Sequence, residues 1–577
     1  MSDRDMVEIP ETRFAPWLME PMRRNSSIYV KVALAAAMIN LFALATSLFT
    51  MVVYDRVLPN NATASLVALS IGLAIVIIFD FALKTLRAYF VDVAGARIDH
   101  EVGGAIFDQL LAIRLDQKKG STGALAGVVR ELETLRDFFA SATLTAIVDV
   151  PFIVITLAVI AIIGGPVVFV PIVMIPLVIL TGLITQPAMD RLAAKSMGQG
   201  LLKQSVLVET IGGLETVKAA GAAPILTERW LGAVEEHSQT SLRQRLVANI
   251  GVTIAGSAQM ISYAGVVIVG VGLIATQDLT MGGLIACSIL AGRAVAPLGQ
   301  IATLLSRMTA TRAAYRQLNA LMRAPTEGPD GEPLVLARTE GKIEFRNVHF
   351  RYPGASEQAL DGVSFTIQPG EHVALLGRVG SGKSTIARLI LGLYEPQEGL
   401  VMLDGTDIRQ LDPISLRRRI GNAMQEGLLL SGSVRENIVL GRADIDDEEM
   451  VRAAELSGTH QFMGQIANGY DLQLADRGEG LSGGQRQSIA IARALVGSPP
   501  VLLFDEPSSA MDQQTEGGLL DRLEREIDGR TFVVITHRTP FLKLVSRVII
   551  VDRGKVVADG PRDQILAKLN RPKVAAI

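Results

Sequence analysis

The sequence predicts a multidomain membrane protein, in which an all-α domain of six transmembrane helices precedes an α/β domain. The first part of this prediction depends on hydropathy: 49% of the 577 residues are hydrophobic and the mean hydropathy is +0.35, too apolar for a soluble chain of this length. The second part depends on residues 377–384, which have the pattern Gly, four residues, Gly, Lys and Ser. An apolar run precedes this pattern and an amphipathic segment follows it, which is the strand, loop and helix context of a phosphate-binding loop.

Charge and cysteine content narrow the class of protein. The net charge is −3 and the isoelectric point is near 6.2, so no basic excess indicates a nucleic-acid partner. The single cysteine, Cys287, cannot form an intrachain disulfide and lies in an apolar run, which favours a packing role. Residues 1–10 are polar and partly acidic, unlike a signal peptide. We therefore expect the N-terminus to stay in the cytoplasm.

Residues 1–27 precede the first long apolar segment. Phe14, Trp17 and Leu18 stand close to Arg23 and Arg24. This mixture suits a segment lying at the membrane interface, and a disordered lead-in accounts for it equally well.

Six apolar segments between residues 28 and 305 form the predicted membrane domain. Each is about as long as the roughly 20 helical residues needed to cross the hydrocarbon core. Residues 54–61 and 164–166 contain Pro with Asn or Gly, which predicts tight reversals of the chain. The predicted spans cover residues 28–53, 62–88, 137–163, 167–186, 247–276 and 279–305.

Two long charged stretches, residues 89–136 and 187–246, interrupt these spans. Both are rich in Lys and Arg near the membrane, whereas the short turns carry only Arg56, so the positive-inside rule places both stretches in the cytoplasm. As helices that rise 1.5 Å per residue, they would extend well beyond the bilayer. We expect the turns near residues 120–123 and 219–224 to contact a cytoplasmic domain, although solvated helix ends explain the same pattern.

Four ionisable residues fall inside the predicted spans. Each costs about 2.5 to 3.5 kcal/mol at the bilayer centre, so each should face protein or water. Asp80 and Lys84 are four residues apart on one helix and are predicted to pair with each other. Asp149 and Arg293 have no local partner in the sequence, and a polar conduit and a mutual ion pair both fit them.

Residues 306–340 are predicted to lead out of the membrane as a linker, and residues 341–577 to form the α/β domain. The linker ends in a cluster of Pro and Gly residues that break helices. In the α/β domain, glycines allow backbone N–H groups to approach phosphate oxygens, while Lys383 adds a positive charge and Ser384 a magnesium ligand. The candidate phosphate-binding residues are Gly377, Arg378, Val379, Gly380, Ser381, Gly382, Lys383, Ser384 and Thr385.

Two carboxylates follow the apolar run at residues 501–504. A buried strand that ends in Asp505 and Glu506, downstream of a phosphate loop, is typical of a nucleoside triphosphatase. Asp505 would hold Mg²⁺, directly or through water, and Glu506 would polarise the attacking water. The sequence therefore predicts nucleotide hydrolysis.

The pentapeptide Leu481, Ser482, Gly483, Gly484 and Gln485 opens a predicted helix and offers a second phosphate cradle. With this pentapeptide the chain resembles the ABC ATPases, and the resemblance extends across residues 341–577. It implies that the signature of one copy closes over the ATP of another, so that a chain with one ATPase domain works as a homodimer. It further implies that Tyr352 stacks on adenine, that Gln425 is the Gln-loop residue beside Mg²⁺, that residues 509–512 form the D-loop, and that His537 is the switch histidine.

Further motifs lie at Tyr54 to Asn61 and Gly283 to Leu298 in the membrane half, and at Thr536 to Arg538 with Asp559 to Pro561 in the ATPase domain. With these motifs the chain resembles the haemolysin- and protease-type exporters of bacterial type I secretion, in the short form without an N-terminal peptidase-like domain. The resemblance implies ATP- and Mg²⁺-dependent export of an unfolded polypeptide across the inner membrane, with membrane lipid around the helices and the ATPase domain in the cytoplasm. A periplasmic adaptor and an outer-membrane channel are the implied partners. A lipid or drug exporter would share every ATPase motif.

Overall fold

A computed structural model describes residues 14–117, 122–139, 142–329, 331–425, 427–466 and 468–569. The chain forms two compact units. The first comprises Met1–Ala112 and Lys119–Ala324, and the second comprises Ile113–Lys118 and Pro325–Ile577. The short segment Ile113–Lys118 therefore belongs to the second unit, although both of its neighbours in the chain belong to the first.

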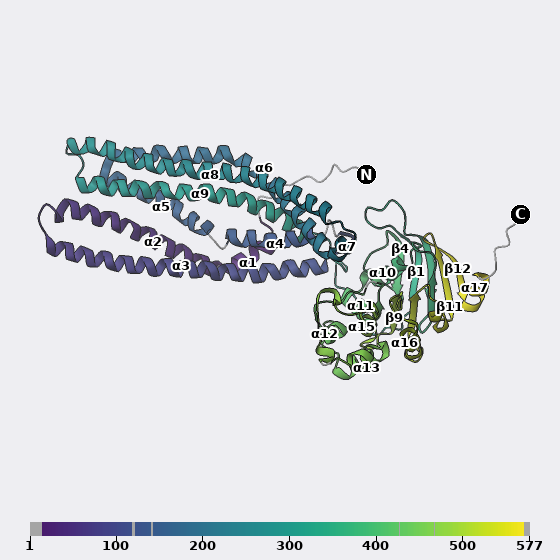
Figure 1. Cartoon of the computed structure of the whole chain (residues 1–577). Coiled ribbons are helices and arrows are strands. Elements are labelled where there is room, and N and C mark those ends of the chain that lie inside the picture. The colour runs from purple at the N-terminus through teal and green to yellow at the C-terminus, as the bar shows by residue number, and fades with distance from the viewer. Residues whose placement is uncertain are drawn as a thin grey trace. The chain divides into compact units, whose positions relative to one another are not determined.

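The first unit is built of helices (Figure 1). Six long ones overlap the six predicted apolar segments, and a short π-helical turn, Val53–Val57, joins the first two of these. The helices are α1 (Pro16–Arg24), α2 (Ser26–Val52), α3 (Thr63–Ala112), α4 (Thr122–Phe139), α5 (Ala142–Gly164), α6 (Phe169–Gly212), α7 (Leu214–Ala219), α8 (Ala223–Ala275) and α9 (Met281–Met322).

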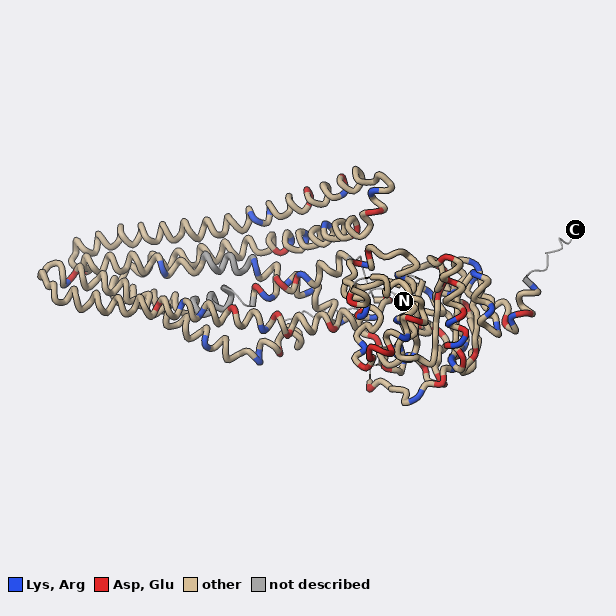
Figure 2. Tube along the Cα trace, turned by 60° about the horizontal axis from the view of Figure 1, so that its bottom comes forward, with Lys and Arg blue, Asp and Glu red and all other residues tan. Residues whose placement is uncertain are grey.

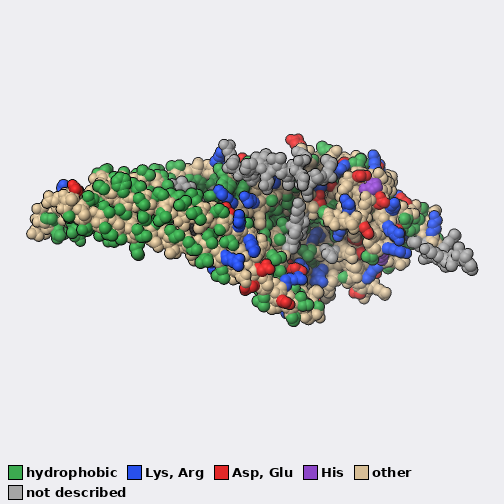
Figure 3. Space-filling view, turned by 90° about the horizontal axis from the view of Figure 1, so that it is seen from above, with side chains coloured by type: hydrophobic (Ala, Val, Ile, Leu, Met, Phe, Trp, Pro, Cys, Tyr) green, Lys and Arg blue, Asp and Glu red, His purple; other side chains and the backbone are tan. Residues whose placement is uncertain are grey.

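The outer surface of this unit is suited to lipid. Within the described residues, five stretches are long and apolar enough to cross a membrane: residues 26–57, 63–112, 150–212, 223–275 and 281–298. The third includes most of α5 and all of α6, which are joined by the tight turn Gly165–Val168. Hydrophobic side chains cover the helices in Figure 3, and Figure 2 shows that charged residues are sparse toward one end of them. Exposed apolar area of this extent indicates a nonaqueous neighbour.

Helix α1 packs against the helical unit. The indole N–H of Trp17 donates to Asn319 Oδ1 at 3.1 Å, the Trp17 ring stacks on Tyr315 with centroids 5.9 Å apart, and Leu18 is only 1% exposed. Residues 16–24 are therefore not the disordered lead-in that the composition also allowed. Their one aromatic residue, Trp17, binds the C-terminal half of α9, while residues 1–13 lie outside the described part of the chain.

Polar contacts join α3 to α9 at two places. One lies near the C-terminal ends of both helices, and the other joins the turn that precedes α3 to the start of α9. Gln109 Nε2 donates to the carbonyl oxygens of Leu321 at 3.4 Å and Ala324 at 3.0 Å. In the turn before α3, the Asp55 carboxylate accepts from Thr280 Oγ1 at 2.7 Å and from Gly282 N at 2.8 Å. This carboxylate therefore caps the N-terminus of α9, where negative charge is favoured.

The ionisable residues of the spans differ in their contacts. Lys84 Nζ lies 2.7 Å from Asp80 Oδ2, so the predicted pair forms. Arg293 Nη1 is buried and has no hydrogen-bond partner among the described residues. The side chain of Asp149 lies outside the described residues, and its predicted alternatives stay predictions.

The second unit contains two larger sheets. An antiparallel one has the order β2-β1-β4-β5, and a mainly parallel one has the order β12-β11-β3-β10-β9-β6. The strands are β1 (Ile343–Phe350), β2 (Leu360–Ile367), β3 (His372–Leu376), β4 (Glu398–Leu403), β5 (Thr406–Asp407), β6 (Ile420–Ala423), β7 (Gly432–Ser433), β8 (Gln473–Leu474), β9 (Val501–Asp505), β10 (Thr531–Ile535), β11 (Arg547–Asp552) and β12 (Lys555–Pro561).

Helices pack around these sheets, and two apolar clusters form the core. Strands β9 and β10 are buried along their whole length, which explains their unbroken apolar runs. The parallel strands β3, β10, β9 and β6 end at one edge, where ligands bind in sheets of this kind. The helices are α10 (Lys383–Ile390), α11 (Pro413–Arg418), α12 (Val434–Val439), α13 (Asp447–Ser457), α14 (Thr459–Met463), α15 (Gly483–Leu495), α16 (Gln513–Glu526) and α17 (Arg562–Leu569).

The predicted linker is only partly irregular. Helix α9 continues to Met322, because residues 306–322 contain neither Pro nor Gly. The predicted cluster of helix breakers follows the helix end.

Candidate active site

The phosphate loop, residues 377–384, connects β3 to α10. Gly377, Gly380 and Gly382 have positive φ values of 153°, 79° and 106°. A Cβ at Gly377 would lie 2.0 Å from the carbonyl oxygen of Val551, and one at Gly382 would lie 2.6 Å from that of Ala359. Neither position has room for a larger residue, so the glycines are required by both backbone conformation and space.

Lys383 lies at the start of α10 and is only 6% exposed. Its ammonium donates to the carbonyl oxygens of Gly377 at 2.7 Å and Arg378 at 2.8 Å. Burial lowers the pKa of Lys383, and the nearby carboxylates of Glu506 and Asp505 act against that shift. The charge is thus held inside the loop, where a phosphate oxygen would compete with the two carbonyls for it.

Asp505 ends β9 and is 2% exposed. Its Oδ1 is buried and has no hydrogen-bond partner among the described residues, and the Ser384 hydroxyl donates to the carboxylate. Burial raises the pKa of Asp505, while the Ser384 hydrogen bond and nearby cations lower it. A buried carboxylate oxygen without a donor, next to a hydroxyl, is a suitable ligand set for Mg²⁺.

Gln425, the third predicted metal ligand, follows the strand beside β9. Ala423 on β6 pairs with Phe504 on β9, so Gln425 and Asp505 emerge at the same edge of the sheet. The Gln425 side chain is exposed.

Glu506 and His537 are brought together at this edge. Glu506 has a φ of 49°, which is uncommon for a residue other than glycine, and its N–H donates to the carbonyl of Ile535 at 2.8 Å. Its Oε1 lies 3.6 Å from His537 Nε2. The half-exposed imidazole therefore lies next to the predicted water-polarising carboxylate.

The signature, residues 481–485, begins α15 with a capping box. Gln485 N–H donates to Ser482 Oγ at 3.2 Å, and Ser482 N–H donates to Gln485 Oε1 at 2.8 Å. A Cβ on either Gly483 or Gly484 would lie 3.1 Å from an atom of Ala510, so the signature packs against the D-loop, residues 509–512. Within the described chain, no hydrogen bond joins residues 482–485 to the phosphate loop.

Tyr352 is hydrogen-bonded to the first turns of α10. Its hydroxyl lies 3.1 Å from Thr385 Oγ1 and accepts from Arg388 Nη1 at 2.8 Å. Its ring meets Tyr394 edge to face, with centroids 5.3 Å apart. The aromatic predicted to stack on adenine is therefore held beside the helix that carries Lys383.

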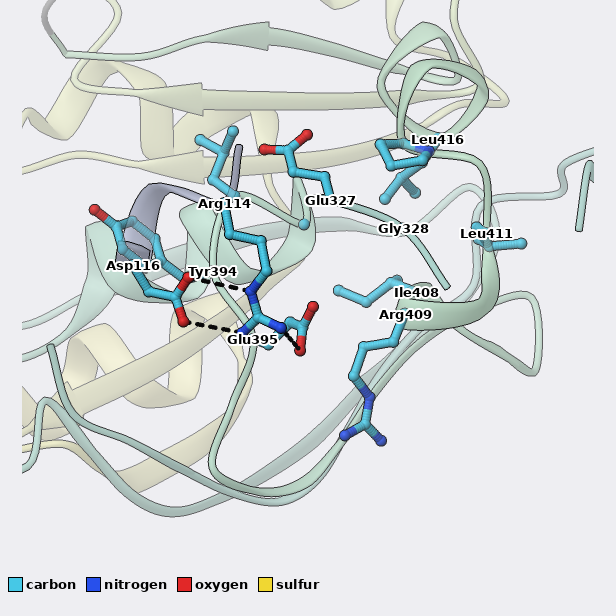
Figure 4. A pocket seen from close by; sticks show the side chains of 13 residues that line it. Arg114, Asp116, Glu327, Gly328, Tyr394, Glu395, Ile408, Arg409, Leu411 and Leu416 are labelled. Atoms are coloured by element: carbon cyan, nitrogen blue, oxygen red, sulfur yellow. Dashed lines mark hydrogen bonds and ion pairs between the residues drawn. The ribbon is translucent and has the colours of Figure 1, made fainter. Parts of the chain in front are cut away.

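Residues 113–118, between α3 and α4, are part of the ATPase unit (Figure 4). Arg114 lies 2.9 Å from Asp116 and 3.0 Å from Glu395. Ile113 forms a β-bridge with Thr326, and Arg114 N–H donates to the carbonyl of Pro325 at 3.2 Å. The contact thus precedes the turn predicted near residues 120–123, of which residues 120 and 121 lie outside the described chain. The second predicted turn, residues 219–224, joins α7 to α8 in the first unit.

Two site residues had no signal in the sequence. Gln487 follows the signature without belonging to it, and its contacts lie on the D-loop and at Glu506. Arg114 is one of many basic residues in its stretch, and the prediction named only the helix breakers that follow it.

Fold and site together define a multi-pass membrane protein with a P-loop ATPase domain. Residues 30–298 match the family of the ABC transporter transmembrane region, and residues 360–509 match the ABC transporter family. The chain belongs to the ABC transporter family.

Individual proteins are similar to this chain across both of its units. The chain is 34% identical to leukotoxin translocation ATP-binding protein LktB of Pasteurella haemolytica-like sp. (strain 5943B), over 96% of this chain and 78% of that protein. It is 33% identical to toxin RTX-I translocation ATP-binding protein of Actinobacillus pleuropneumoniae, again over 96% and 78%. A bacterial Atm1-family ABC exporter with ATP bound has the same fold, with a TM-score of 0.84 and 23% identity over 95% of this chain and 97% of that one.

Proposed function

We propose that this chain is the ATP-hydrolysing membrane component of a bacterial type I secretion system and exports an unfolded polypeptide. The observation that carries the proposal is the similarity to toxin translocation ATP-binding proteins, which spans 96% of the chain and thus both the membrane helices and the ATPase. A similarity confined to the ATPase would support ATP hydrolysis alone, since a lipid or drug exporter carries the same motifs.

The proposed working form is a homodimer in the inner membrane. The signature of each copy covers the ATP held by the phosphate loop of the other. Support comes from the local bonding of these residues within one chain: Ser482 and Gln485 bond to each other, and Lys383 bonds to its own loop. Residues 28–305 form the proposed membrane domain and residues 341–577 the cytoplasmic ATPase domain. A periplasmic adaptor and an outer-membrane channel complete the proposed export path.

The proposed hydrolysis uses the residues at the sheet edge. Backbone N–H groups of residues 377–385 and the ammonium of Lys383 bind the triphosphate, while Tyr352 stacks on adenine. Glu506 accepts a hydrogen bond from the attacking water and orients it, and His537, beside that carboxylate, helps to hold the terminal phosphate. Ser384, Asp505 and Gln425 would hold Mg²⁺, which neutralises charge on the phosphates.

Coupling to export is proposed to use residues 113–118. This segment follows α3 directly and is held to the ATPase by the ion pair of Arg114 with Glu395, 3.0 Å long. ATP-driven closure of the ATPase dimer would displace that segment, and α3 would carry the displacement into the membrane domain.

The test of this proposal has two parts. Purified full-length protein should hydrolyse ATP, and Glu506→Gln should retain ATP binding while losing nearly all turnover. Near-normal steady-state ATPase in that variant would contradict the role of Glu506. Deletion of the gene should remove at least one protein from the culture medium, and the parent but not Glu506→Gln should restore it. An unchanged set of secreted proteins would contradict polypeptide export and favour a small-molecule exporter.

A further inference from the structure

One side chain links the signature helix to the catalytic strand end. Gln487 lies in the first turns of α15. Its Nε2 donates to the main-chain oxygen of Glu506 at 2.7 Å and to Ser509 Oγ at 3.1 Å, and its Oε1 accepts from Ala510 N–H at 3.0 Å. Both amide protons and the carbonyl oxygen are therefore engaged, and all three contacts are made to the segment that begins with Glu506.

The main chain at Glu506 needs this support. Glu506 has a φ of 49°, a left-handed conformation that costs a non-glycine residue free energy and persists only where its surroundings hold it. Its N–H is fixed by Ile535 at 2.8 Å, and its carbonyl oxygen also receives the N–H of Ser509 at 3.2 Å. The main-chain group that Gln487 binds therefore determines the direction of the Glu506 side chain.

A second residue also holds the D-loop. Arg538, directly after His537, donates to the carbonyl of Ser509 at 3.3 Å and forms an ion pair with Glu516 at 3.3 Å. The D-loop is therefore bound both by a residue of the signature helix and by a residue of the switch segment. A shift of α15 would therefore be transmitted to Glu506 directly by the side chain of Gln487.

We propose that Gln487 is a positioning residue for ATP hydrolysis, which holds the main chain of Glu506 and the D-loop so that the Glu506 carboxylate faces the attacking water. The inference rests on the proposed function. In the proposed dimer, the N-terminus of α15 covers the ATP of the other copy, whereas Glu506 serves the ATP of its own. Gln487 then makes the orientation of Glu506 depend on the position of the signature.

The test compares variants of the full-length protein in ATPase assays. Gln487→Leu removes all three hydrogen bonds, and Gln487→Glu keeps the acceptor for Ala510 but loses the donor to Glu506. We expect kcat to fall about tenfold in both, with KM and the affinity for a fluorescent ATP analogue within twofold of the parent. Gln461→Leu, at an exposed position on α14, should leave kcat unchanged. A kcat within threefold of the parent in a folded variant, or a loss carried by KM, overturns the inference.

A double variant separates positioning from general damage. If Gln487 acts through Glu506, Gln487→Leu in the Glu506→Gln background should cause no further loss of residual single-turnover hydrolysis, because the group it positions is already absent. A further tenfold loss overturns the inference. Failure of the proposed function is distinguishable, because normal hydrolysis by Glu506→Gln alone would contradict the role of Glu506, and an unchanged set of secreted proteins after gene deletion would contradict polypeptide export without altering these ATPase comparisons. Should Gln487→Leu fail to fold, Gln487→Glu, which is nearly isosteric, carries the same comparison.

Discussion

Replacing Asp505 by asparagine should stabilise the nucleotide-free protein while abolishing Mg²⁺-dependent ATP hydrolysis. The carboxylate is 2% exposed, and its Oδ1 is buried without a hydrogen-bond partner among the described residues. Burial is the largest influence on the pKa of Asp505 and raises it, so the ionised form is disfavoured in the absence of a metal. Asparagine has nearly the same shape and carries no charge.

The size of the effect follows from the cost of the buried charge. A buried polar group without a partner costs about 1 to 3 kcal/mol and a charged one costs more, so we take this range as the gain when asparagine removes the charge but keeps a polar atom. For a domain of this size, 1 kcal/mol changes the melting temperature by about 2 to 4 °C, which predicts a rise of about 2 to 12 °C for the ATPase transition. Because the folded-state pKa of Asp505 lies above its unfolded value, the folded parent binds a proton more tightly. Its stability relative to Asp505→Asn therefore improves as the pH falls through that raised pKa.

The assay is thermal unfolding of the full-length protein in detergent, with and without Mg-ATP, at neutral pH and at successively lower pH. The parent should gain stability from Mg-ATP, and Asp505→Asn should gain little, because it has lost a metal ligand. Asp521→Asn, at an exposed position on α16, controls for the loss of one negative charge. A nucleotide-free Asp505→Asn protein that melts below the parent at neutral pH would refute the reasoning.

Three further predictions concern other contacts. Lys383→Ala should weaken ATP binding in calorimetry at least tenfold, because it removes the buried charge of the phosphate loop; unchanged binding would contradict the assignment of that loop. Asp55→Ala should destabilise the membrane domain by about 2 kcal/mol, because it removes the acceptor for Thr280 and Gly282, whereas a melting temperature equal to the parent's would show that the cap contributes nothing. Arg114→Glu should reduce export with little change in ATP affinity. Adding Glu395→Arg should restore export if the ion pair between these two residues couples ATP hydrolysis to export, and no rescue would place the coupling elsewhere.

The residues of the candidate site could be singled out in the sequence because phosphate chemistry needs particular residue types at fixed spacing. A loop that cradles phosphate needs glycines at Gly377 and Gly382, where a Cβ would collide with neighbouring backbone. A metal ligand at the end of a buried strand needs an apolar run before Asp505. These requirements are local in the sequence, so the pattern of residues records them directly.

The contacts of Gln487, Trp17 and Arg114 are not local in this sense. Gln487 bonds to residues on another strand end, and Trp17 bonds to Asn319, 302 positions away in the chain. Nothing in the neighbouring sequence specifies such partners, since the same residue types occur at solvated positions. Packing of the whole unit decides them, and only the structure reveals them.

The chain at the end of α3 and the chain at the end of α9 contact each other in both units. In the first unit, Gln109 near the end of α3 bonds to the carbonyls of Leu321 and Ala324 at the end of α9. In the second unit, the residues that follow directly, Ile113 and Thr326, are paired in a β-bridge. Because the chain after α3 and the chain after α9 are joined on both sides of the boundary between the units, we expect a displacement of residues 113–117 to act on both helices together. The Asp55 cap joins the turn before α3 to the start of α9 as well, so α3 and α9 are joined to each other near both of their ends.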